Sequence, residues 1–424
     1  MTERHMQDFP FGEVQANIFK GHGRYHAWHL FICFRPECQI GIKSWLHDHV
    51  LPLITSAQQQ LDMIRRHRED PGYDGGMVGC LALSASAYAK LGIPEKEWPE
   101  DQEFRAGMKS RGPILNDPEV MLWEAGYQND LDAVLILADN EPDKLQETAN
   151  QLKASLERSG SGSICRTEIG TVLEPGGPCR EHFGFVDSIS QPDFWDAYGR
   201  FHETAWKLAL VRDQQSPHLY GSYLVFRKLE QNVKRFRDQV RSIAGQIIAP
   251  NALELAEAQT MGRFRNGLPL TLCSGSLPND FKYLENTDLH GSKCPFHAHM
   301  RKANPRNKGY KAKQLTRRGI PYGTRKPDLS DEPETGVGLL FISYQVAISN
   351  FEEVQIQCND PGPGPHSTLD PIIGQPVPGT TLKPQAWNKK WHDPAAFPYT
   401  FQPVVQLKGG EYFFQPPLTY LKEL

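Results

Sequence analysis

The chain repeats one order of strand and helix patterns, and this repetition is the strongest constraint on its fold. In the first half, apolar runs of strand length cover residues 28–34, 78–83, 131–138 and 164–173, and the clearest helical pattern covers residues 143–156. Weaker helical patterns lie between the other runs. The resulting order, β-α-β-(α)-β-α-β, is typical of a ferredoxin-like α+β sandwich.

The second half shows the same kinds of pattern in a similar order. Apolar runs typical of strands cover residues 222–229, 337–346 and 410–415, and helical patterns cover residues 233–243 and 348–356. We therefore predict an α+β protein of duplicated ferredoxin-like domains, each an antiparallel sheet with helices.

The length of the chain suggests where these domains begin and end. A chain of 424 residues exceeds one ordinary hydrophobic core and indicates more than one domain. We predict an N-terminal domain over residues 1–180, a connecting segment over 181–216 and a C-terminal domain over 217–424. Residues 359–384 are rich in Pro and Gly and are predicted to form a long loop that wraps the surface or borders a site.

Charge and composition narrow the range of partners. A formal net charge of −4 gives no electrostatic case for binding nucleic acid or an anionic membrane surface. The first 25 residues carry no secretory signal and no apolar run is long enough to span a bilayer, so we expect a cytoplasmic protein with small-molecule partners. The eight cysteines include no Cys-x-x-Cys pair, so we expect reduced thiols and no structural zinc site. The sequence leaves a homo-oligomer open.

One basic segment contains two closely spaced histidines. Residues 294–306 read CPFHAHMRKANPR, and taken alone they are compatible with a solvated surface loop. The pattern resembles the haem-ligating segment of dye-decolourising (DyP-type) peroxidases, in which the histidine after alanine binds the haem iron. The resemblance implies that His299 is the axial metal ligand of haem b in the C-terminal half. His297 stands where the family usually has a small residue, and we expect it to be structural.

A second segment resembles the other signature of that family, Gly-x-x-Asp-Gly. Residues 184–188 read GFVDS, so Asp187 matches the aspartate while Ser188 replaces the final glycine. The resemblance implies that Asp187 lies over the open face of the haem and handles the proton of the peroxide. The family's Arg-Arg-Gly element corresponds to residues 317–319, which implies Arg317 as the distal catalytic and haem-contacting cation, with Arg318 as the alternative.

These residue types suit peroxide chemistry. Haem iron needs one protein ligand and an open opposite face, and a ligating imidazole donates electrons better when its second nitrogen is hydrogen-bonded to a carboxylate. Glu352 and Glu353 are candidates for that carboxylate, because they follow a predicted core strand. On the open face, a carboxylate that accepts a proton and returns it to the leaving oxygen is worth about 10²–10⁴-fold. A guanidinium then stabilises the developing negative charge.

Four further residues are candidates for the haem pocket or its connections. Leu339 and Phe341 lie on the strand predicted at residues 337–346 and are expected in the pocket wall, although core packing explains them equally well. Arg301 is a candidate partner for a haem propionate, with a surface ion pair as its alternative. Tyr322 is a candidate relay of oxidising equivalents to bulky donors at the surface.

The resemblance spans most of the chain and implies a haem peroxidase. Such an enzyme reduces hydrogen peroxide to water and oxidises dyes, phenolic compounds or similar aromatic donors. Ser188 motivates an alternative, a haem carrier or sensor with weak peroxidase activity, because a glycine at this position suits a positive φ. A catalytically silent structural protein is a second alternative, and it predicts that the chain binds no haem.

Overall fold

The structure is a computed structural model that describes most of the chain. The described residues are 9–195, 201–202, 204–214, 216, 218–272, 281–284, 287–306, 314–359 and 368–424. The strands are β1 (His26–Phe34), β2 (Val78–Leu83), β3 (Ala133–Asp139), β4 (Gly162–Thr171), β5 (Val211–Arg212), β6 (Tyr220–Gln231), β7 (Thr316–Arg317), β8 (Ile320–Tyr322), β9 (Gly338–Gln345), β10 (Gln385–Asn388), β11 (Ala396–Tyr399) and β12 (Val405–Gln415).

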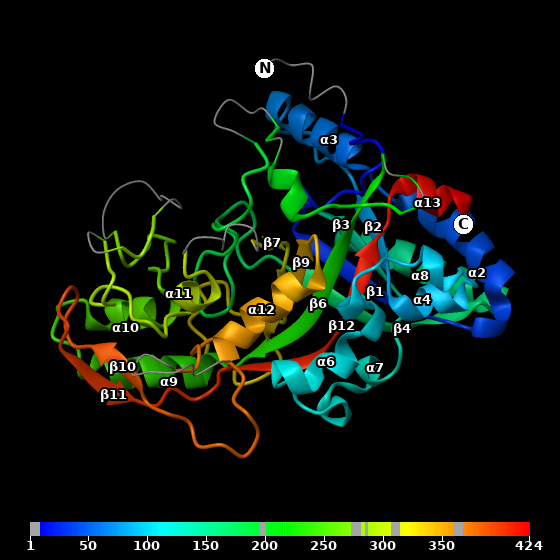
Figure 1. The fold of residues 1–424 in the computed structure, drawn as a ribbon. Helices are drawn as coiled ribbons and strands as arrows, with labels where there is room; N and C mark the ends of the chain where they lie inside the picture. The colour runs from blue at the N-terminus through cyan, green and yellow to red at the C-terminus, as the bar shows by residue number, and fades with distance from the viewer. Residues whose placement is uncertain are drawn as a thin grey trace.

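Helices flank these strands on more than one side. The α-helices are α2 (Gln39–Trp45), α3 (Ala57–Glu69), α4 (Ala85–Lys90), α5 (Gln102–Ala106), α6 (Met108–Leu115), α7 (Ala125–Gln128), α8 (Pro142–Ser159), α9 (Val233–Ala244), α10 (Ala252–Met261), α11 (His299–Ala303), α12 (Ile348–Asn359) and α13 (Leu418–Glu423). Figure 1 shows α2 and α8 on one side of the central strands and α9, α10 and α11 on the other. No helix in the described ranges is both long and apolar enough to cross a membrane.

The long strands form one antiparallel sheet that closes on itself. The strand order is β5-β6-β12-β2-β3-β1-β4-β8-β9-β7, and an additional pairing of β6 with β9 closes the ring between them. Closure removes the free edges that an open sheet would leave unpaired. The two halves join at two narrow seams, where Phe414 of β12 pairs with Leu83 of β2 and Gly170 of β4 pairs with Tyr322 of β8.

Each half of the ring has the same topology. Numbered along the chain, the N-terminal strands lie in the order 2-3-1-4, as β2-β3-β1-β4, and the C-terminal strands lie in the same order, as β8-β9-β6-β12. This order, with helices packed against the sheet, is that of a ferredoxin-like unit. The predicted α+β fold with duplicated ferredoxin-like units is therefore confirmed.

Burial explains why the N-terminal strands read as nearly continuous apolar runs. Every residue of β2 and β3 is buried, because side chains on both faces of these strands are covered. On one face lies α8, whose Leu145, Leu152 and Leu156 are buried at helical spacing, as the sequence pattern predicted. The opposite face contributes to a core shared with strands of the second half.

A separate apolar cluster supports the C-terminal half. Asn232 caps the start of helix α9, because its side chain accepts a hydrogen bond from the backbone N–H of Arg235 at 2.7 Å. The helix buries Val233, Phe236 and Val240 against α10 and the β10–β11 hairpin region. This cluster is distinct from the core of the barrel and holds the helical layer that carries His299.

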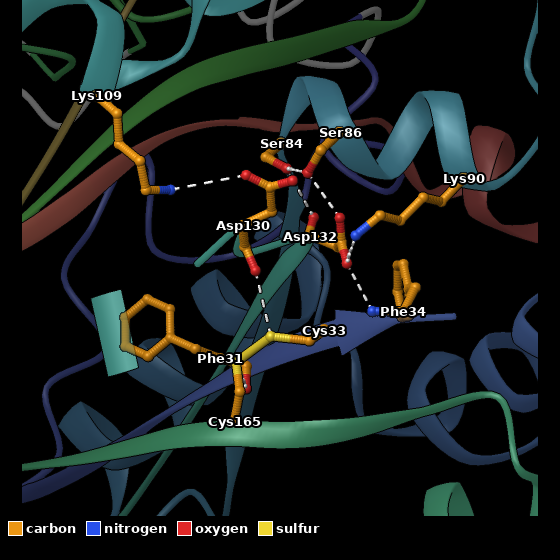
Figure 2. The surroundings of a disulfide bond; sticks show 10 residues. All are labelled: Phe31, Cys33, Phe34, Ser84, Ser86, Lys90, Lys109, Asp130, Asp132 and Cys165. Carbon is orange, nitrogen blue, oxygen red and sulfur yellow. Dashed lines mark hydrogen bonds and ion pairs between the residues drawn. A yellow bond between two sulfur atoms is a disulfide. The ribbon is translucent and has the colours of Figure 1, made fainter. Parts of the chain in front are cut away.

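A disulfide links two neighbouring N-terminal strands. Cys33 of β1 and Cys165 of β4 are bonded, with their Cα atoms 6.0 Å apart, and Figure 2 shows the bond bridging the two strands. It lies beside a shift in strand register between Phe31 and Ile32. The expectation of uniformly reduced thiols is therefore wrong for this pair. The two cysteines lie 132 residues apart in sequence, so only the strand pairing brings them together.

The other described cysteines are free thiols. They are Cys38, Cys80, Cys179, Cys294 and Cys358, whereas Cys273 lies outside the described residues. Because one pair is oxidised, the thiols no longer support the inference of a reducing compartment.

Candidate functional site

A cavity lies between the C-terminal part of the sheet and the helical layer. Alternate residues of β6, namely Arg227, Leu229 and Gln231, face into it from the sheet. Leu339 and Phe341 of β9 lie directly opposite Leu229 and Arg227 in the strand register and also line the cavity. Across the cavity lie residues of α11, α12 and the loop after α12, among them His299, Met300, Phe351, Val354 and Ile372.

The structure brings the predicted pocket residues to one place. Asp187, His299, Arg317, Leu339 and Phe341 all line this cavity. Leu340, by contrast, is fully buried on the other face of β9 and belongs to the barrel core, as strand alternation requires.

His299 is the first residue of α11, and its ring is held by an aspartate. The Nδ1 atom of His299 lies 2.8 Å from Oδ2 of Asp370, an almost fully buried residue in the loop after α12. The other oxygen of Asp370 accepts hydrogen bonds from the backbone N–H groups of Ile372 and Ile373, at 2.7 and 3.1 Å. With Nδ1 donating to Asp370, the lone pair of Nε2 is left to bind a metal.

The charge state of Asp370 suits this role. Burial alone would raise the pKa of its carboxyl, but the adjacent His299 ring and the hydrogen bonds from that ring and from the backbone hold the pKa below its usual range. Asp370 is therefore a carboxylate that can accept from the imidazole and make it a stronger electron donor.

Neither glutamate proposed from the sequence occupies this position. Glu352 accepts two hydrogen bonds from Arg111, at 2.9 and 2.7 Å, and one from the hydroxyl of Tyr412 at 3.0 Å. Glu353 is exposed on the outer side of α12. The helix directs both carboxylates away from His299, and the correct partner, Asp370, lies in the Pro- and Gly-rich loop that follows.

Asp187 and Arg317 form an ion pair that faces the cavity. Nη1 of Arg317 lies 2.6 Å from Oδ1 of Asp187. Burial alone would raise the pKa of the Asp187 carboxyl, but the charge of Arg317 and the hydrogen bond from the backbone of Ser188 hold it below its ordinary value. The side chain of Asp187 is therefore ionised at neutral pH.

A side-chain clamp fixes Arg317 against the connecting segment. Gln191 accepts a hydrogen bond from the backbone N–H of Arg317 at 2.9 Å and donates one to its carbonyl oxygen at 3.2 Å. Asp187, four residues earlier, is tied by its backbone N–H to the carbonyl of Cys179 at 2.8 Å. These contacts hold the acid and the guanidinium in one arrangement, although they come from segments far apart in the sequence.

Ser188 has the backbone conformation of the glycine that it replaces. Its φ is +64°, in the left-handed region, and its N–H donates to Oδ1 of Asp187 at 2.6 Å. The backbone next to Asp187 therefore has a conformation that favours glycine, although the residue is a serine. Holding a serine in this conformation costs some backbone strain.

Arg318 does not reach the cavity. Its guanidinium donates to the backbone carbonyls of Asn17 at 2.9 Å, Ile18 at 2.7 Å and Arg317 at 2.8 Å. These contacts attach β7 to the N-terminal segment. Of the two adjacent arginines, Arg317 is thus the one that the fold directs toward Asp187.

Arg301 is also absent from the cavity wall. Its guanidinium donates to the carboxylate of Asp288 at 3.0 Å and to the carbonyl of Cys294 at 2.7 Å, and it stacks 4.3 Å from the ring centroids of Tyr283 and Phe296. The structure therefore gives no support to Arg301 as a propionate partner. Its place in the sequence motif reflects the packing of the segment before α11.

His297 and Tyr322 are both buried. His297 packs against Trp387 with ring centroids 4.2 Å apart, in keeping with the structural role expected for it. Tyr322 lies in β8, and the ammonium of Lys228 lies 4.8 Å from its ring centroid. Within the part of the chain that the structure describes, its hydroxyl has no hydrogen-bond partner. Because Tyr322 is only 8% exposed, the structure does not bring it to a surface where bulky donors dock.

The cavity fits a flat apolar group that carries one metal ion. Its walls are mainly aliphatic and aromatic, and one supported imidazole, an acid and a guanidinium line the same cavity. A compact metal ion is a poorer fit. Ligand atoms of His299, Cys358 and Asp370 lie within 4.8 Å of one another, but the closest histidine nitrogen already donates to Asp370.

Three residues of this candidate site were not singled out from the sequence. Asp370 and Gln191 hold His299 and Arg317, and Arg227 lines the cavity from β6. Asp370 had a local signal, since an aspartate in a Pro- and Gly-rich stretch often accepts hydrogen bonds from the backbone that follows it.

Comparison with protein families gives matches over most of the chain. Residues 13–180 match the family model described as the DyP dimeric alpha+beta barrel domain. Residues 180–364 match the model described as the C-terminal part of Dyp-type peroxidases.

Individual relatives match nearly the whole length. The multifunctional dye peroxidase DyP2 of Amycolatopsis sp. (strain ATCC 39116 / 75iv2) is 34% identical, over 97% of this chain and 95% of the relative. The dye-decolorizing peroxidase AauDyP1 of Auricularia auricula-judae is 30% identical, over 96% of this chain and 85% of the relative. The crystal structure of the DyP-type peroxidase of Anabaena sp. has a TM-score of 0.86 at 34% identity, covering 100% of this chain and 99% of that one.

Proposed function

The chain belongs to the DyP-type peroxidase family, and from this premise we propose that it reduces hydrogen peroxide to water with haem b held by His299. Membership of the family makes the chain a haem peroxidase. We further propose that Asp187 and Arg317 act on the peroxide at the open face of the haem. The observation that carries it is the single cavity lined by the supported imidazole and by the acid–guanidinium pair.

The residues of the cavity suit the binding of haem b. When bound, haem supplies a redox-active iron with one coordination position open to peroxide. His299 would bind the iron through Nε2, and Asp370 would fix the orientation of the ring and increase its electron donation. Leu339 and Phe341, with Leu229, would pack against the haem and exclude water from it.

The distal pair would manage the proton of the peroxide. Asp187 is ionised at neutral pH, so its carboxylate can accept a proton from hydrogen peroxide and return it to the leaving oxygen. Arg317 keeps its charge throughout and would stabilise the negative charge that develops on the departing oxygen. Because Arg317 also contacts Asp187, it keeps the carboxylate ready for the next proton.

The names of the relatives support dyes and similar aromatic compounds as the reducing substrates. Two of them are named for dye peroxidase or dye-decolorizing activity. We propose the same class, dyes or phenolic donors, for this chain. The alternative of a haem carrier or sensor rested on Ser188, and the left-handed conformation of that residue supports the peroxidase instead.

Rapid mixing of the haem-loaded protein with peroxide tests this function. We expect a prompt change in the Soret band of the wild type and a reaction at least 100-fold slower in Asp187→Asn or Arg317→Leu, with haem still bound. Asp193→Asn is the matched control, because Asp193 is exposed and lies six residues beyond Asp187. Equal rates in all four proteins would exclude the proposed distal roles.

A further inference from the structure

Arg227 is a buried cation with unused hydrogen-bond donors in the cavity wall. It lies in β6 opposite Phe341 and is only 2% exposed. Its Nη2 donates to Asp117, while Nε and Nη1 have no hydrogen-bond partner among the described residues. Among the cavity-lining residues within the described ranges, it is the one side chain with buried N–H groups left unpaired.

The surroundings of Arg227 do not satisfy these donors. The ring of Phe351 packs 5.5 Å from the guanidinium carbon, and a π-face is a weak acceptor. Asp117 contacts Nη2 through Oδ1, which also accepts from Gln375 at 2.6 Å. Leaving a buried donor unpaired costs about 1–3 kcal/mol, and more for a charged group. An acceptor that enters the cavity would therefore be stabilised at this position.

The part of the cavity wall that β6 forms, from Arg227 to Gln231, differs in charge between its two ends. Gln231 lies four residues beyond Arg227 on the same face of the strand, about 13 Å away. Its side chain donates to the carboxyl of Glu181, another buried residue that lines the cavity. Burial raises the pKa of Glu181, and an added anion nearby would be unfavourable. An anionic ligand would therefore place its charged edge at the Arg227 end.

Two other arginines in the described ranges line the cavity, and their contacts differ from those of Arg227. Arg317 is paired with Asp187. Arg263 donates to the carbonyl of Gly267 at 2.9 Å, and burial together with the charge of Arg306 lowers its pKa to about 10. Arg263 is the main competitor for an anion, so it belongs in any test.

We propose that Arg227 binds a carboxylate of the ligand that fills this cavity, namely a propionate of haem. The inference rests on the proposed function, because haem is the ligand implied by the family. It adds a residue that the sequence motifs did not suggest, and it orients the haem so that a propionate edge faces β6 near Phe351 and Gln375 rather than Glu181.

Metal-free porphyrins test this proposal separately from iron ligation and turnover. The full chain, freed of haem, is titrated with protoporphyrin IX and with its dimethyl ester, and binding is followed by fluorescence. The ratio of the two dissociation constants measures how much the free carboxylates contribute. We expect the wild type to favour the acid, and Arg227→Met to reduce the ratio by about tenfold or more, as expected for one charge-assisted hydrogen bond.

Two further variants keep the test decisive if Arg227→Met folds poorly. Asp117→Asn removes the internal counter-charge but keeps Arg227, so the preference for the acid should be retained or increased. Arg227→Lys keeps the charge and should give an intermediate ratio.

Three results would overturn the proposal. These are an unchanged ratio in both Arg227 variants, loss of the preference through Arg263→Met alone, and equal binding of acid and ester by the wild type. If the wild type binds acid and ester equally, the unpaired donors of Arg227 bind a water molecule or a separate acid instead. The peroxidase proposal is unaffected by this result, because the porphyrins carry no iron.

Discussion

Asp187, the proposed base, lies beside a fixed positive charge, and this contact influences the pH range in which its carboxyl is ionised. The guanidinium of Arg317 is 2.6 Å from the carboxylate and keeps the pKa of Asp187 below its usual range. The ionised form of Asp187 and the ion pair are therefore both present at neutral pH. Both are lost as the pH falls through the depressed pKa of Asp187, so the pair stabilises the fold above that pH and not below it.

The pH profile of the residual activity tests this coupling. Replacing Arg317 by Leu removes the charge that lowers the pKa of Asp187, while burial continues to raise it. We therefore expect the acid limb of kcat/KM for peroxide to move to higher pH in Arg317→Leu. An acid limb at the wild-type pH would show that another group controls it. Asp193→Asn should leave the limb in place, since this residue is exposed.

Ser188 provides a second prediction at the level of single residues. Its φ of +64° is strained for any residue with a Cβ, so Ser188→Gly should stabilise the fold by about 1 kcal/mol. Chemical denaturation of both proteins measures the difference, and the reaction with peroxide should be unchanged. The control is Ser163→Gly in β4, where glycine should destabilise the strand by about 0.5–1 kcal/mol. Destabilisation by both substitutions would contradict the assigned conformation.

At the level of elements, the support of His299 comes from a loop rather than from a helix. Sequence patterns located His299, Asp187 and Arg317, since each lies in a short motif. They could not locate Asp370, because a loop folded against α11 brings it to the histidine from 71 residues away. The guess of Glu352 failed because the helical turn directs its carboxylate toward Arg111.

Substitution of these two carboxylates distinguishes their roles. Asp370→Asn keeps an acceptor near Nδ1 but removes the charge, so we expect haem to remain bound and the reaction with peroxide to slow by about 10–100-fold. Its haem should also become easier to reduce, which a redox titration measures. Glu352→Gln should change the stability of the fold but not the reduction potential. If Glu352→Gln instead changes the reduction potential and Asp370→Asn does not, Glu352 rather than Asp370 supports His299.

The disulfide between β1 and β4 links two elements and contributes to the stability of the fold. It closes a long loop and should stabilise the fold by about 2–4 kcal/mol. Denaturation of the double variant Cys33→Ala/Cys165→Ala, compared with the wild type, measures this contribution. The Soret band of the haem-loaded variant should be unchanged, because neither cysteine lines the cavity. Cys38→Ala controls for the loss of a free thiol, and equal stability of all three proteins would indicate that the bond contributes nothing.

For the whole molecule, the sequence predicted the two halves but not how they close. The long apolar strands and the amphipathic helices were predictable because each buries a regular face, as in β3 and α8. The short strands β7 and β8 were not predictable from the sequence. Their pairing with β9 defines them, and their residues show no strand pattern of their own. The seams of the barrel depend on single pairs such as Gly170 with Tyr322, which leave no signal in the sequence.

The closed barrel has a consequence for the cavity. Strand β6 pairs with β12 on one side and with β9 on the other, so the sheet wall of the cavity has no free edge. Arg317, which is paired with Asp187, lies in β7 of this sheet, while His299 lies in α11 and Asp370 in the loop after α12. A ligand in this cavity would therefore contact parts of the molecule that meet only in the folded chain.

The absorption spectrum of His299→Gly reconstituted with haem, with and without added imidazole, tests the central claim most directly. If His299 binds the iron, the variant should lose the wild-type Soret band, and imidazole should restore it by entering the space left by the side chain. A variant that shows the wild-type spectrum without imidazole would contradict the account, because another residue would then hold the iron.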